Sequence, residues 1–293
     1  MMVYGPEMQD VELHPESMRS SSVQGRSSSM KRDLTIACCA LFLAASICNA
    51  DEWNKHWSVG AKPELHVMAG DAAIVVEAAG GNSIDATLRT RGYSIGDSGV
   101  RVTEHQTDNR IEIEVREPAM HFGFGEHSIH LELRVPKEVV AYLHTGDGSV
   151  TLRKVHGPVQ VDTGDGSVEG EDLDGSLDAH SGDGSVHVSG RFDILRLHTQ
   201  DGSVDVNALR GSRMQADWRV ETGDGSVRLN LPRNLPADLE LRTGDGGIRM
   251  NLPVSVTGKQ SENEVHGKLN GGGRLLTVRT GDGSITVSPL PGS

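Results

Sequence analysis

Short runs in which apolar and polar residues alternate fill most of the chain after about residue 60. Between residues 145 and 162, for example, Val150 and Leu152 alternate with polar residues, and Val159 and Val161 do the same. A period of two is typical of a β-strand with one buried face. Glycine-containing turns separate the runs, and we expect these glycines to supply positive φ angles. The pattern of each repeating unit therefore predicts a strand, a turn, a second strand and a second turn.

A five-residue phrase, Thr-Gly-Asp-Gly-Ser, recurs through the second half of the chain. Exact or close copies begin at Thr145, Thr163, Ser181, Thr199, Thr222, Thr243 and Thr280. The first three steps are each 18 residues long, and the later steps are 23, 21 and 37 residues. A period of this kind marks a repeat architecture, in which each unit buries its apolar face against its neighbours. We also expect the threonine column to form a ladder of hydroxyl groups.

Apolar positions of successive units line up in columns. One column is Val150, Val168, Val186, Val204, Val227, Ile248 and Ile285. Coils about 4.8 Å apart would join such columns into one continuous apolar interior. The predicted fold class is all-β, a β-solenoid of coils of about 18 residues. Its regular repeats span residues 141–289, and irregular β coils at residues 62–140 form an N-terminal cap.

The far end of the predicted stack is the end of the chain. The last strand stops at Val287-Ser288-Pro289, and we expect Pro289 and Pro291 to blunt that edge. The long segment before it, residues 252–279, has room for one degenerate coil around Glu264–Asn270.

The first 50 residues differ in character from the rest. Residues 1–29 are polar and aperiodic, which indicates a disordered leader or a misplaced start codon. Residues 30–50 contain Lys31-Arg32, an apolar run and a small-residue site, which are the parts of a secretory signal peptide. That run is too short to span a membrane. We therefore expect an exported mature chain without a transmembrane span, beginning with a short lead-in at residues 51–61.

Composition narrows the classes of function. The net charge of −13 argues against a nucleic-acid partner, because nucleic acids need a basic surface. The sequence contains no G-x-S-x-G, no H-E-x-x-H and no phosphate-binding glycine loop that leads into a helix. We accordingly expect no enzyme, no catalytic residues and no cofactor.

The chain resembles a family of exported bacterial proteins classed as putative adhesins, a domain of unknown function with Gly-Asp-Gly β-solenoid repeats. The resemblance rests on Gly70-Asp71 before a short strand, on Leu133-Arg134-Val135-Pro136, and on the repeated phrase. It covers about residues 62–287. It implies a β-solenoid, a location in the periplasm, at the cell surface or outside the cell, and no established catalytic residues.

The most conspicuous candidate site is the aspartate of each repeat. Stacked coils would place Asp147, Asp165, Asp183 and Asp201 in a row, where like charges repel unless something neutralises them. Calcium between the turns would do so, although the glycine-rich calcium β-roll motif is missing. The alternative is an Asx-type turn in which each carboxylate accepts backbone N–H groups.

Other candidates lie on the outward side of the coils. A second row, His144, Asp162, His180 and His198, has side chains suited to a partner contact or a transition metal. Trp218 lies in an inserted segment, residues 208–221, where it is either a contact residue or an anchor.

We consider three functions for these features. The first is a non-enzymatic envelope scaffold that binds a macromolecular ligand. The second is a structural protein whose coils self-associate end to end, and the third is a calcium-binding module. The insertions favour the first function, since a polymer tends to keep uniform edges.

Overall fold

The computed structural model describes residues 51–118, 127–256 and 261–291, and every regular element within them is a β-strand. These residues belong to one compact unit. The predicted leader (1–29) and signal peptide (30–50) lie outside the described residues. In the described part of the chain, no helix is long and apolar enough to cross a membrane.

Most of the strands are short, and they follow one another closely. They are β1 (Glu52–Ser58), β2 (Glu64–Ala69), β3 (Ala73–Ala79), β4 (Ser83–Arg91), β5 (Arg101–Thr107), β6 (Arg110–Arg116), β7 (Ser128–Pro136), β8 (Val140–Thr145), β9 (Val150–Arg153), β10 (His156–Thr163), β11 (Val168–Ser181), β12 (Val186–Thr199), β13 (Val204–Ala208), β14 (Trp218–Thr222), β15 (Val227–Leu231), β16 (Ala237–Thr243), β17 (Ile248–Met250), β18 (Val254–Val256), β19 (Glu264–Leu269), β20 (Arg274–Thr280) and β21 (Ile285–Pro289). The prediction of an all-β chain is confirmed.

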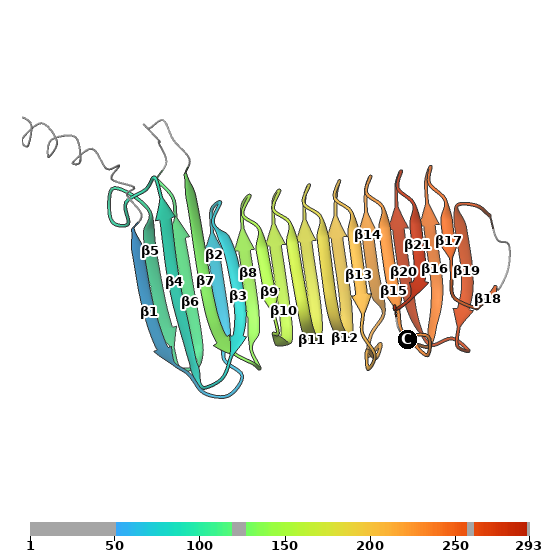
Figure 1. Cartoon of the computed structure of the whole chain (residues 1–293), viewed down its shortest axis with the longest axis horizontal. Coiled ribbons are helices and arrows are strands. Elements are labelled where there is room, and N and C mark those ends of the chain that lie inside the picture. Colours follow the sequence, from blue (N-terminus) through green and yellow to red (C-terminus); the bar gives the residue numbers. More distant parts are fainter. Residues whose placement is uncertain (1–50, 119–126, 257–260, 292–293) are drawn as a thin grey trace, which may run out of the picture. The chain divides into compact units, whose positions relative to one another are not determined.

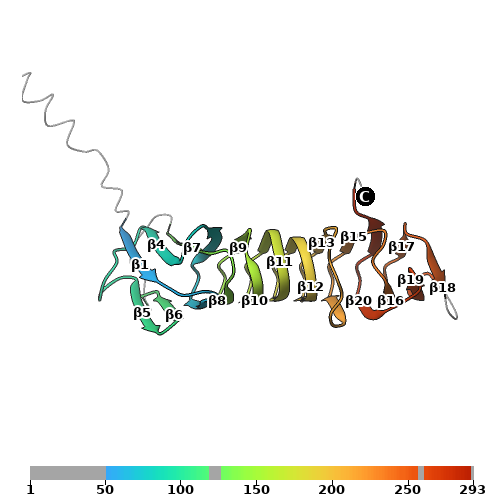
Figure 2. The same ribbon diagram turned by 90° about the horizontal axis from the view of Figure 1, so that it is seen from below.

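Strand pairing arranges these elements in two rows with an apolar interior between them (Figures 1 and 2). Face A runs β5–β6–β2–β8–β10–β11–β12–β14–β20–β16–β19–β18. Face B runs β1–β4–β7–β3–β9–β11–β12–β13–β15–β21–β17. The long strands β11 and β12 belong to both faces, and their pairing shifts register where each turns the corner.

The predicted apolar columns form the interior. Val150, Val168, Val186, Val204 and Val227 are all at most 1% exposed, and they stack in register from strand to strand. The column beside them contains Gly170 where other coils have an apolar side chain, and Leu173 packs against this glycine. The period-two pattern therefore identified the buried face correctly.

The order of the coils in space differs from their order in sequence at both ends. The coil of β2 and β3 lies between β6/β7 and β8/β9, and it pairs in parallel with strands on both sides. Likewise, the coil of β20 and β21 lies between β14/β15 and β16/β17. The last coil of the chain thus lies between two other coils of the stack and not at its end (Figure 1).

This arrangement corrects the prediction for the far end. Pro289 does not blunt an edge, because it ends β21, whose residues lie between β15 and β17. The end of the stack is formed by β17 and by the antiparallel strands β19 and β18. The degenerate coil predicted around residues 264–270 is therefore a strand, β19, that runs back along β16 rather than continuing the coil.

At the other end, the segment predicted as a lead-in contains β1, which pairs antiparallel with β4. Trp57 is buried, and its ring lies 6.3 Å from that of Trp53. Lys55 of β1 forms an ion pair with Glu104 of β5. Charged side chains of this kind on an edge strand discourage pairing with another chain.

The repeated turns are held by their threonines. In the turn at Thr199, the hydroxyl donates to the Gly184 carbonyl of the preceding coil at 2.8 Å and accepts the N–H of Gly202 at 3.3 Å. Equivalent hydrogen bonds to the adjacent coil of the stack occur at the other copies of the phrase. The predicted column of hydroxyls is present, since these residues are Cα partners from coil to coil, but each hydroxyl bonds to backbone and not to the next hydroxyl.

The glycines of these turns are required for space. A methyl group at Gly166 would lie 1.9 Å from the carbonyl oxygen of Gly148 in the preceding coil. None of the glycines with a positive φ lies in the repeated phrase; two of them, Gly157 and Gly175, are in the opposite turn. The prediction of positive φ in the phrase was therefore wrong, and close packing of successive turns is the reason for the glycines.

Candidate binding surface

The predicted histidine row exists on face A. His144, Asp162, His180 and His198 are Cα partners in four successive strands, β8, β10, β11 and β12, and all four are exposed. The Nδ1 atom of His144 lies 3.6 Å from Oδ1 of Asp162, and the rings of His180 and His198 are 5.8 Å apart. The described residues contain no group of three or more His, Cys, Asp or Glu side chains placed to hold a metal ion.

The predicted aspartate ladder lies along one edge of the stack. Asp147, Asp165, Asp183 and Asp201 are exposed in successive turns. The hydrogen bonds of the described residues include none to these four carboxylates, because the threonine hydroxyls hold the turns instead. The Asx-type turn is thus not the geometry observed, and calcium binding stays a prediction.

Trp218 is 1% exposed, so the prediction of a partner contact was wrong for this residue. Its Nε1 donates to the carbonyl of Asp193 at 3.2 Å, and its ring meets Phe192 edge to face with centroids 6.4 Å apart. Trp218 therefore packs the inserted segment onto the core, which was the alternative reading.

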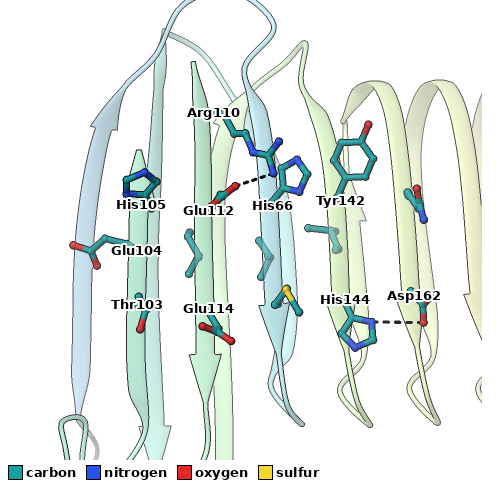
Figure 3. Close-up of a pocket in the computed structure, with 15 residues that line it drawn as sticks. His66, Thr103, Glu104, His105, Arg110, Glu112, Glu114, Tyr142, His144 and Asp162 are labelled. Atoms are coloured by element: carbon teal, nitrogen blue, oxygen red, sulfur yellow. Dashed lines mark ion pairs between the residues drawn. The ribbon is translucent and has the colours of Figure 1, made fainter. Parts of the chain in front are cut away.

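A concavity of about 450 Å³ opens on face A near the N-terminal end of the stack (Figure 3). Strands β5, β6, β2, β8 and β10 supply its lining. Val67, Ile113 and Leu143 also line it, but their side chains are buried in the interior of the stack, so strand backbone forms its floor. Two residues of the predicted row, His144 and Asp162, lie at its edge.

This concavity gathers the exposed apolar side chains of the described residues. The large hydrophobic residues with substantial exposure are Met68 (56%) and Tyr142 (39%), and both line it. His66 and Tyr142 are Cα partners on β2 and β8, and their rings stack with centroids 4.5 Å apart. Figure 3 shows these two rings standing side by side on neighbouring strands. A stacked ring pair beside an exposed methionine in a concavity is typical of a ligand site.

Polar groups surround the aromatic pair. Glu104, Glu112, Glu114 and Asp162 contribute four carboxylates against one arginine, Arg110, whose Nη2 lies 2.7 Å from Glu112. His66 Nε2 also lies 2.5 Å from Glu64, just outside the lining, and this hydrogen bond holds the pKa of Glu64 below its ordinary value. The surface is consequently rich in hydrogen-bond acceptors, and neighbouring cations neutralise part of its charge, because Lys55 pairs with Glu104 and Arg116 with Glu114.

Comparison with known protein families shows which family the chain belongs to. The family model described as Toastrack DUF4097 matches residues 64–288. The chain belongs to the Toastrack family. The match includes both faces of the stack, the two displaced coils and the concavity. No curated protein matches the chain.

Several solved structures are similar to this Toastrack chain. A putative cell adhesion protein from Clostridium sporogenes ATCC 15579 is 14% identical, with 82% of this chain and 100% of that one covered and a TM-score of 0.36. A putative adhesin from Parabacteroides merdae ATCC 43184 is 12% identical, with 82% and 97% covered and a TM-score of 0.38. A putative lipid binding protein from Parabacteroides distasonis ATCC 8503 has the same identity and coverage and a TM-score of 0.36.

Sequence reasoning found only one edge of this Toastrack surface. It identified His144 and Asp162 but missed His66, Met68 and Tyr142. A signal for them exists, because aligning Gly70-Asp71 with the repeated phrase puts His66 opposite Tyr142. No local pattern in the sequence, however, predicts that β6 pairs with β2. The carboxylates of β6 could therefore not be predicted as part of the site.

Proposed function

We propose that this chain is a non-enzymatic binding protein of the bacterial cell envelope, exported by the signal at residues 30–50. Its two-faced stack acts as a rigid β-solenoid scaffold, and the concavity on face A holds a macromolecular ligand. The observation that carries the proposal is the coincidence of the exposed Met68 and Tyr142 with a 450 Å³ concavity. Exposed apolar groups rimmed by polar ones mark interaction sites.

The lining favours a saccharide as the ligand. Tyr142 and Met68 offer an apolar contact for the C–H face of a sugar ring, and the four carboxylates accept hydrogen bonds from hydroxyl or amino groups.

The polar groups of the site support binding rather than catalysis. None of the titratable side chains that line it is buried. Catalytic acids and nucleophiles generally rely on burial to shift their pKa values toward the working pH. A ligand that spans several strands, by contrast, gains from repeated exposed contacts on a rigid face.

A second observation disfavours end-to-end self-assembly. The strands that end the stack at the C-terminal side, β17 and β18, have three residues each, and Lys55 and Glu104 place an ion pair at the other end. Short and charged edges are devices that limit strand pairing between molecules.

The test is a glycan array probed with the labelled chain, the Tyr142→Ala variant and the His187→Ala variant. His187 is an exposed ring on face B and serves as the matched control. We expect a subset of bacterial envelope glycans to bind the wild type and the control, and to bind Tyr142→Ala at least tenfold more weakly. Binding that Tyr142→Ala leaves intact, or an array without signal, would refute the proposed site.

A further inference from the structure

A second hollow on face A carries the opposite charge from the concavity just described. It has a volume of about 490 Å³ and lies where the inserted segment between β13 and β14 meets β12, β14 and β20. Three arginines line it, Arg196, Arg219 and Arg274, against one carboxylate, Asp217. Such a cluster is unexpected in a chain whose net charge is −13.

The arginines are brought together at an energetic cost. Arg196 of β12 and Arg219 of β14 are direct Cα partners in neighbouring parallel strands, and like charges in this position destabilise a sheet. Both form only long ion pairs: Arg196 Nη1 lies 3.7 Å from Asp178, and Arg219 Nε lies 3.9 Å from Glu221. Ion pairs among the described residues include none for Arg274. The guanidinium groups are therefore poorly neutralised within the protein.

The wall of the hollow is firmly held. The N–H of Gln215 donates to the carbonyl of Asp193 at 3.0 Å, and that of Arg213 donates to the carbonyl of Phe192 at 3.0 Å. Asp217 accepts the N–H of Leu275 at 3.0 Å, which engages one oxygen of the only carboxylate that lines the hollow. With Trp218 anchored beneath, the inserted segment forms a fixed side to a cationic site.

We propose that this hollow binds an anionic group, a carboxylate, sulfate or phosphate, between Arg196, Arg219 and Arg274. Guanidinium groups suit these oxyanions because their N–H donors match the spacing of two oxygen atoms. Thr277, the Cα partner of Arg219 on β20, adds a hydroxyl donor at the same surface. This site is independent of the saccharide site near Tyr142 and uses none of its residues.

The experiment is calorimetric titration of the purified full chain with inorganic phosphate, sulfate and trigalacturonate at low ionic strength. The variants are Arg219→Gln and Arg274→Gln, and the control is Arg228→Gln, an exposed arginine on face B paired with Asp205. We expect at least one probe to bind the wild type and the control equally, and to bind both site variants at least tenfold more weakly. The ratio of phosphate to trigalacturonate affinity separates a phosphate-bearing ligand from an acidic saccharide.

Three results would overturn the proposal. They are the absence of binding by every probe, equal binding by the site variants and the wild type, and an equal loss in the Arg228→Gln control. Thermal unfolding without probe gives a second readout. We expect Arg219→Gln to unfold at a higher temperature than the wild type, because repulsion from Arg196 is relieved. A lower unfolding temperature would mean that Arg219 stabilises the fold through ion pairs, which would count against the proposal.

Discussion

Each threonine of the repeated phrase joins its own turn to the adjacent coil of the stack. Thr199 is fully buried; its hydroxyl donates to the carbonyl of Gly184 and accepts the N–H of Gly202, and it also lies 3.0 Å from the carbonyl oxygen of Gly182. Ser181 makes the same two hydrogen bonds in its coil. The first position of the phrase therefore requires a hydroxyl group, and the methyl group of threonine contributes less to holding the turn.

Replacement of this hydroxyl should be costly. Thr199→Val keeps the shape of the side chain but leaves a buried carbonyl and a buried N–H without partners, which costs roughly 2–4 kcal/mol in the free energy of unfolding. Thr199→Ser, the residue found at position 181, should lose less than about 1 kcal/mol. Urea unfolding of the two variants checks this. Equal losses would show that packing of the methyl group, and not the hydroxyl, holds the turn.

The second glycine of the phrase tests the close approach of successive turns. A Cβ at Gly166 would meet the Gly148 carbonyl oxygen at 1.9 Å, whereas a Cβ at Gly247 has no atom within 4 Å. We expect Gly166→Ala to destabilise the chain by more than about 3 kcal/mol, and Gly247→Ala to change stability by less than about 0.5 kcal/mol. Thermal unfolding of both variants measures the difference. Similar stabilities would mean that adjacent turns can separate at little cost.

At the scale of the strands, the main feature is the displacement of one coil at each end. β20 and β21 come last in the chain, yet they connect β14 and β15 to β16 and β17. Side chains of the displaced coil, including Leu276, Val278 and Ile285, are fully buried in the common interior. The C-terminal coil is thus structurally central although it is terminal in sequence.

Deletion of residues 274–293 therefore has a specific expected effect. Without β20 and β21, β16 and β17 lose their parallel partners, and the apolar interior is exposed between the remaining coils. We expect amides of β14 and β16 to exchange hydrogen much faster in the truncated chain than in the full chain, because both strands lose a neighbour. Unchanged protection of β14 and β16 would show that the coils can restack in sequence order.

The sequence predicted the coil itself well and the order of coils poorly. Period two and the 18-residue step define the buried columns around Val168 and Val186, because these depend on local pattern. The displacement of β20 depends on which coil packs more favourably against β14, a contact between residues far apart in the sequence. No local pattern of residues predicts such a contact. The same limit hid the concavity, whose lining joins β6 to β2 across 46 residues of sequence between Glu64 and Arg110.

For the whole molecule, charge is unevenly distributed over the stack. The turn edge carries an exposed aspartate in successive coils, and face A carries an acidic concavity and a cationic hollow. Carboxylates about 5 Å apart repel by roughly 0.8 kcal/mol in water at low salt. The aspartates are therefore a source of instability unless a cation neutralises them.

Neutralising two of these aspartates tests whether their carboxylates destabilise the fold by repulsion or bind calcium. We expect Asp165→Asn combined with Asp183→Asn to raise the midpoint of thermal unfolding by a few degrees at low ionic strength, and the difference to vanish in 1 M salt. A lower midpoint would mean that these carboxylates make stabilising contacts. A calcium-dependent rise in the wild type that the variant lacks would instead assign the ladder to calcium.

The central claim is that the concavity around Tyr142 binds a ligand, and nuclear magnetic resonance titration tests it most directly. The probes are chitotetraose and its deacetylated, cationic form, added to the isotope-labelled full chain. We expect chemical-shift changes confined to β2, β6 and β8, with the larger response to the cationic form, whose amino groups donate hydrogen bonds to the carboxylates. Shifts centred on face B, or no shifts at millimolar probe, would contradict it.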